Sequence, residues 1–219
     1  MSMFLGPIHQ WLYNKIQIGA GRATAIEEGF KNEFGSEAEG IIAEVDDKYP
    51  SFPVGIDLED IIGDAPIHGF LSGLIRMIEC REAGLVAAFV NKFGDPAKET
   101  AIVASTDYGK RTGEDAKGDI EEGNTESLFK ALYDRQLDGM PCDQGAQPNF
   151  QKEGIIIRQN ECLHSINWQE AGAPLDVMCQ ITGAWIKGFL QGAAPSMKYS
   201  MEASVIAGES ECQYSINSQ

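Results

Sequence analysis

The sequence predicts an α+β fold, with helices over most of its length and a small antiparallel sheet near its end. Three observations support this prediction. Apolar residues recur at helical spacing through long stretches of the first 137 residues. Runs rich in β-branched residues follow only after residue 150. Because helices come first and strands late, rather than in alternation, a parallel sheet is not expected.

Two long helices are expected in the N-terminal part, at residues 7–34 and 66–93. In both, apolar residues recur along one face. A proline in the first turn of the second helix and Gly94 after its last turn are typical start and stop residues. Pro50 and Pro53 indicate a loop at residues 46–55, and Asp57 could cap a short helix that ends at Ile62. No internal repeat stands out.

The later elements are shorter and close with a hairpin. Gly109 and Gly113 lie four residues apart on one helix face, which favours close packing of that helix against another element. The polar residues 139–150 predict a loop. Further helices are expected at 97–117, 126–137 and 174–191, and strands at 154–158, 162–168, 198–207 and 211–216, with Gly208 in the last turn.

The composition disfavours several classes of partner. Hydrophobic residues make up 43% of the 219 residues, which is enough for a full core. The net charge of -16 repels phosphate backbones and anionic lipids, so neither nucleic acid nor a membrane is expected as a partner. No apolar run of about 18 residues predicts a transmembrane helix. The N-terminus also lacks the pattern of a signal peptide.

The five cysteines favour a reducing location. Their number is odd, and without an export signal a disulfide framework is not expected. We therefore expect a soluble, cytoplasmic protein. Each cysteine is then a buried structural thiol, a metal ligand or a nucleophile, and the sequence leaves these alternatives open.

Potential metal ligands gather in the C-terminal third. Cys162 and His164 lie on an expected strand, Cys179 in the first turns of the next helix, Glu202 on the following strand and Cys212 after the hairpin turn. If that helix packs on the hairpin, these elements adjoin. Thiolate, imidazole and carboxylate donors suit zinc or ferrous iron. The set contains no Cys-x-x-Cys pair, so ordinary buried thiols remain the alternative.

The other two histidines receive a different interpretation. His9 and His68 each lie on an expected helix and have no ligand-type neighbour in sequence. We interpret both as packing residues.

Several segments carry a resemblance to a known family: Phe93 to Ala97, Tyr108 to Gly113, Glu126 to Phe129, Met178 to Leu190, Met201-Glu202 and Ala207 to Tyr214. From about residue 92 to 216 the chain resembles vinyl-4-reductase-type domains. These bind small molecules and are similar in fold to heme nitric-oxide-binding domains and vesicle-tethering subunits. The resemblance implies a ligand-binding domain at 92–219. Residues 1–91, which the resemblance does not cover, are expected from their apolar periodicity to form a helical region packed against that domain.

This resemblance also implies a zinc site. In aromatic-sensing members of the family, cysteines and a glutamate hold a zinc ion, and the matching residues here are Cys179, Glu202 and Cys212. The family often has another cysteine about three residues after the glutamate, where this chain has Ser204-Val205. Cys162 or His164 would then have to supply the missing ligand.

A second resemblance rests on Cys162, Glu170-Ala171-Gly172-Ala173-Pro174, Cys179 and Gly208 to Cys212. These segments are similar to the family of L-2-amino-thiazoline-4-carboxylic acid hydrolase. The resemblance implies hydrolysis of a small cyclic C–N or C–S substrate. Metal-bound water would be the nucleophile, with Glu170 or Glu202 as the base.

The aromatic residues Trp168, Trp185, Phe189 and Tyr199 lie around the expected metal elements. They could line an apolar ligand pocket, or they could be ordinary core residues.

Three functions follow from these patterns. The first is a metal-containing small-molecule-binding protein, which would signal through a protein partner because the chain contains no output motif, and which could form a homodimer. The second is the hydrolase. The third and weakest is an iron protein, with heme on His9 or His68, or an iron–sulfur cluster on Cys162, Cys179, Cys212 and one more cysteine.

Overall fold

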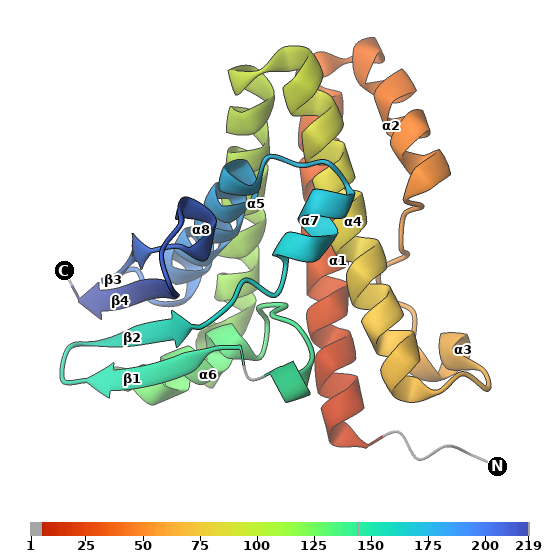
Figure 1. The fold of residues 1–219 in the computed structure, drawn as a ribbon. Helices are drawn as coiled ribbons and strands as arrows, with labels where there is room; N and C mark the ends of the chain where they lie inside the picture. Colours follow the sequence, from red (N-terminus) through yellow and green to blue (C-terminus); the bar gives the residue numbers. More distant parts are fainter. Residues whose placement is uncertain (1–5, 144, 219) are drawn as a thin grey trace.

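The protein has the expected α+β fold in a computed structural model that describes residues 6–143 and 145–218. Figure 1 shows a layer of long helices with a small sheet at one side of its lower end. The helices are α1 (Pro7–Phe34), α2 (Ser36–Lys48), α3 (Leu58–Ile62), α4 (Ile67–Phe93), α5 (Asp95–Ala116), α6 (Thr125–Tyr133), α7 (Ser165–Glu170) and α8 (Leu175–Ala193). The strands are β1 (Gln147–Gln151), β2 (Gly154–Gln159), β3 (Met197–Ala203) and β4 (Cys212–Ser218).

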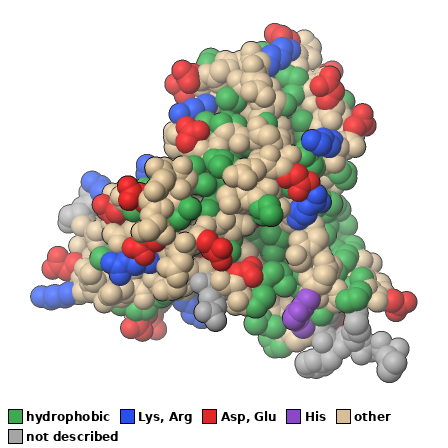
Figure 2. All heavy atoms as spheres, in the orientation of Figure 1, with side chains coloured by type: hydrophobic (Ala, Val, Ile, Leu, Met, Phe, Trp, Pro, Cys, Tyr) green, Lys and Arg blue, Asp and Glu red, His purple; other side chains and the backbone are tan. Residues whose placement is uncertain are grey.

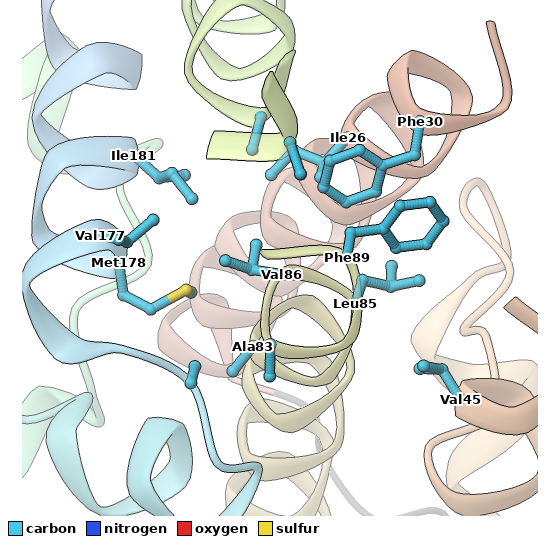
Figure 3. Close-up of a cluster of buried hydrophobic side chains, with 14 of the residues drawn as sticks. Ile26, Phe30, Val45, Ala83, Leu85, Val86, Phe89, Val177, Met178 and Ile181 are labelled. Carbon is cyan, nitrogen blue, oxygen red and sulfur yellow. The ribbon is translucent and has the colours of Figure 1, made fainter. Parts of the chain in front are cut away.

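The largest hydrophobic cluster joins the N-terminal helices to the C-terminal part of the chain. Figure 3 shows Ile26 and Phe30 of α1 beside Phe89 of α4, with Met178 and Ile181 of α8 on the other side. All five side chains are fully buried. The N-terminal helices therefore pack against the rest of the protein, as expected, and their core is continuous across residue 91.

Helices α5 and α8 approach each other through glycines. A Cβ atom at Gly109 or Gly113 would overlap a backbone carbonyl oxygen of α8, at Trp185 or Phe189 respectively. The reverse holds for Gly188 of α8, where a Cβ would overlap the backbone of α5. The predicted packing role of Gly109 and Gly113 is confirmed, because only glycine lets two helix backbones come this close.

The sheet is antiparallel throughout, in the order β1-β2-β4-β3. Its inner face packs on α8, with Ile155, Ile157, Tyr214 and Ile216 buried in one cluster with Trp185. Successive strand residues point to opposite faces, so polar side chains of β3 and β4 occupy the outer face. The hairpin expected near the C-terminus is present, with Gly208 at φ 97° in its connection.

Two local expectations were wrong, and helix α2 was not expected. Residues 162–168 do not form a strand, because a turn leads into α7 and the Ser165 hydroxyl donates to the carbonyl of Cys162 at 3.0 Å. The expected loop at 139–150 contains most of β1, whose polar residues are largely exposed on an edge strand. Helix α2, to which no element had been assigned, packs Ala38, Ile42 and Val45 on the core.

The described helices contain no candidate membrane span, since none of them is both long and apolar enough to cross a bilayer.

Candidate functional site

Three cysteines line one small cavity between α8, the hairpin and the turn before α7. They are Cys162, Cys179 and Cys212. The cavity has a volume of about 40 Å³. A single water needs roughly 10–15 Å³ by this measure, so the cavity holds an ion or a few small atoms rather than a large ligand.

Each thiol reaches the cavity from a different element. Cys162 lies in the turn that precedes α7, Cys179 in the second turn of α8, and Cys212 at the start of β4. The inner face of β4 packs toward α8, which brings the last two together. Cys212 Sγ also accepts a hydrogen bond from the backbone N–H of Val205 at 3.4 Å. The adjacency expected from a helix packed on a hairpin is therefore present.

The surroundings of Cys162 and Cys179 favour their neutral thiol forms. Burial raises the pKa of Cys179 to about 11, and the neighbouring Cys162 thiol adds to this shift. Burial also raises the pKa of Cys162, although the backbone N–H groups of His164 and Ser165 act in the opposite direction. Because a thiolate is the metal ligand and the nucleophile, an ion would have to displace protons to bind here.

His164 borders the same cavity and is held by buried acids. Its Nδ1 lies 2.7 Å from Glu79 Oε1, and its Nε2 lies 3.7 Å from Asp138 Oδ1. Burial lowers the pKa of His164, but the attraction of Glu79 and Asp138 outweighs burial and the net shift is upward. The ring also stacks on Trp168, with centroids 5.0 Å apart. These contacts fix the orientation of the imidazole.

Hydroxyl groups complete the wall of the cavity. Thr182 Oγ1 is buried and has no hydrogen-bond partner among the described residues. Burial raises the pKa of both Tyr199 and Tyr214, so their phenols stay protonated and can donate. An unpartnered buried hydroxyl is costly, and a polar occupant of the cavity would satisfy it.

The remaining predicted site residues lie outside the cavity. Glu202 projects from the outer face of β3, where its carboxylate accepts a hydrogen bond from Ser215 at 3.0 Å. Its neighbour Met201 faces the cavity instead, as strand alternation requires. Trp185 and Phe189 are buried in the core between α8 and the sheet.

Glu170, the predicted base, is also outside the cavity. It forms a bidentate ion pair with Arg76 of α4, and both side chains are exposed. Of the four predicted aromatic residues, only Trp168 and Tyr199 line the cavity.

The residue types around the cavity suit a soft metal ion, but their present positions do not enclose one. Three thiols in one cavity are the donors that zinc and iron prefer. Within residues 6–143 and 145–218, however, no three His, Cys, Asp or Glu side chains stand close enough to hold an ion as they are. Side-chain rotation would be needed to close the site around a metal.

The iron alternatives fit less well. The heme alternative uses His9 or His68, neither of which lines this cavity, and a cavity of about 40 Å³ is in any case far too small for heme. A four-iron cluster needs four cysteines, whereas Cys80 and Cys142 do not line this cavity. Cys80 is buried elsewhere, with its thiol 3.6 Å from the carbonyl of Asn167, and Cys142 is exposed. None of the five cysteines forms a disulfide in the described structure.

Comparisons with protein-family models, curated proteins and solved structures found no match to the chain. The two family resemblances stay predictions.

Proposed function

We propose that the protein binds a small molecule in the cavity between α8 and the hairpin, beside a metal ion held by Cys162, Cys179 and Cys212. The observation that carries this proposal is the convergence of three thiols, from three separate elements, on one small cavity. Isolated buried thiols need no such convergence, since each can be satisfied as an ordinary core residue.

A nitrogen donor is also at hand. His164 borders the cavity, and Glu79 already holds its Nδ1, so an ion would bind Nε2 in place of the contact that this nitrogen makes with Asp138 at 3.7 Å. In zinc sites a carboxylate commonly binds the second nitrogen of a ligating histidine and orients the ring. Glu79 fits that role, which the sequence alone did not suggest. Three thiolates and one imidazole form a ligand set typical of structural zinc.

A bound ion would supply positive charge and a Lewis-acidic centre to the cavity. Trp168 and Tyr199 would supply apolar and aromatic contacts, and the free Thr182 hydroxyl a polar one. The small volume favours a ligand of few atoms, or one that enters as the half-exposed Met201 side chain moves. A soluble, cytoplasmic setting agrees with these reduced thiols.

Binding is favoured over hydrolysis. Glu170 is neutralised by Arg76 and does not line the cavity. A general base must come within hydrogen-bond reach of the water that it activates, and no observation gives Glu170 that position.

Metal content of the purified chain tests the proposal. We expect at least one zinc or iron ion per chain in the wild type by elemental analysis. Replacing Cys179 or Cys212 by Ser should lower both metal content and melting temperature, because a thiolate site contributes folding energy. Cys80→Ser is the control, since Cys80 is a buried thiol that lies outside the cavity. Full metal occupancy in Cys179→Ser and Cys212→Ser would refute the proposal.

A further inference from the structure

The two longest helices belong to an internal repeat, although no repeat was expected. Residues 7–38 match residues 66–97 without a gap, each residue corresponding to the one 59 positions later. Both segments begin with Pro-Ile-His, and both have Phe-Gly where the long helix ends. Eleven of the 32 positions are identical: Pro7, Ile8, His9, Leu12, Ile16, Arg22, Phe30, Asn32, Phe34, Gly35 and Ala38 recur at their counterparts.

The backbone follows the same repeat. Helix α1 ends at Gly35, with φ 55° and ψ -132°, and α4 ends at Gly94, with φ 65° and ψ -136°. The carbonyl of each glycine accepts a hydrogen bond of 3.1 Å from the N–H three residues later, at Ala38 and Ala97. Both alanines are fully buried. The same helix–turn–helix unit therefore occurs twice, as α1–α2 and as α4–α5.

The two units pair in parallel and in register, as Figure 1 shows for α1 and α4. The rings of Phe30 and Phe89 stack with centroids 4.1 Å apart, and those of Phe34 and Phe93 with centroids 4.0 Å apart. In each stack, a phenylalanine of α1 contacts the phenylalanine that lies 59 positions later, in α4. This register brings the two corresponding histidines together at the opposite end of the helix pair.

His9 and His68 meet at the start of α1 and α4. Their ring centroids are 5.8 Å apart and their planes make an angle of 67°. Two imidazoles that share one ion through bonds of about 2.0–2.1 Å have centroids roughly 5–6 Å apart. His9 Nδ1 is buried without a hydrogen-bond partner in the described part of the chain. His68 is exposed, and Figure 2 shows histidine surface at this end of the molecule.

We propose that His9 and His68 form a second metal site, which binds a divalent transition-metal ion such as Ni²⁺ or Zn²⁺. Imidazole nitrogen is a good ligand for both ions. No third His, Cys, Asp or Glu of the described residues joins the pair, so water completes the coordination shell. The positive N-terminal ends of α1 and α4 repel a cation here, whereas the protein's net charge of -16 attracts it. The site uses no thiol and is independent of the proposed cysteine site.

Calorimetric titration of the full chain with Ni²⁺ tests this site. We expect the affinity for Ni²⁺ at this site to fall about tenfold or more in His9→Ala or His68→Ala. At low Ni²⁺ concentration, the wild type should therefore bind one more Ni²⁺ per chain than either variant. The double variant should lose little beyond each single one, because both rings hold the same ion. Circular dichroism checks that the variants keep their helices.

Two controls keep the outcomes apart. Gln10→Ala changes an exposed neighbour on α1 and should leave Ni²⁺ binding unchanged. Cys179→Ser should keep the histidine-dependent ion even if it loses the metal of the cysteine cavity. Wild-type stoichiometry and affinity in both histidine variants would overturn the proposal. So would one ion per two chains, since that ion would bridge two copies instead of two helices of one chain.

Discussion

Lys15 shows how a single charged residue is accommodated in the interior of this protein. Only 1% of its surface is exposed, and its Nζ lies 4.2 Å from the ring centroids of both Trp11 and Tyr133. Burial lowers the pKa of Lys15 from 10.5 to about 8, against the attraction of Asp138 and Asp134. The aromatic faces and the two carboxylates offset part of the cost of burying the ammonium group.

The shifted pKa predicts a pH-dependent stability. Below pH 8 Lys15 is charged in both the folded and the unfolded chain. Between pH 8 and 10.5 the unfolded chain binds more protons, so the free energy of unfolding should rise with pH, by an amount on the order of 3 kcal/mol. Because thiols and phenols also titrate in this pH range, the free energy of unfolding of the wild type is compared with that of Lys15→Met, by urea unfolding at each pH. Parallel pH profiles for the two proteins would rule out the shift.

The candidate site could be predicted only in part at the level of residues. The sequence pointed to Cys162, Cys179 and Cys212, because cysteines are rare and their expected elements adjoin. It did not point to Glu79 or Asp138, which hold His164 from distant parts of the chain. Carboxylates are common on helix surfaces, and only tertiary packing shows which of them are buried beside an imidazole.

At the level of elements, the glycine contact between α5 and α8 is the most sensitive to substitution. Gly109→Ala should destabilise the protein by about 1–3 kcal/mol or more, because the added methyl group would overlap the carbonyl of Trp185. Gly73→Ala is the matched control in α4, where a Cβ meets no atom within 4 Å. It should stabilise by about 0.5–1 kcal/mol, through the better helix propensity of alanine. Chemical unfolding of both variants measures the contrast, and equal effects would refute the packing argument.

The long helices and several short elements, among them β2 and β4, could be predicted from sequence, whereas α7 and β1 could not. Periodic apolar residues over many turns identify α1 and α4 almost to the residue. The segment 162–168 carries apolar residues over too few positions to separate a strand from the single-turn helix α7. Strand β1 has almost no apolar signal, because its side chains are mostly exposed. Its pairing with β2 is a tertiary feature.

At the level of the whole molecule, the thiol cavity joins two hydrophobic clusters. Cys162 and Cys179 pack with the cluster of α1, α4 and α8, whereas Tyr199 and Tyr214 belong to the cluster beneath the sheet. An ion held between these parts would tie the helical layer to the sheet. This arrangement explains why we expect metal loss to lower the stability of the entire fold and not only of the hairpin.

X-ray absorption spectroscopy at the edge of the bound metal tests the central claim most directly. The proposed site predicts a first shell dominated by sulfur, at about 2.3 Å if the ion is zinc. The sulfur contribution should shrink in Cys212→Ser and stay unchanged in Cys80→Ser. A first shell of nitrogen and oxygen alone would show that the three converging cysteines do not bind the metal, and would contradict the proposed site.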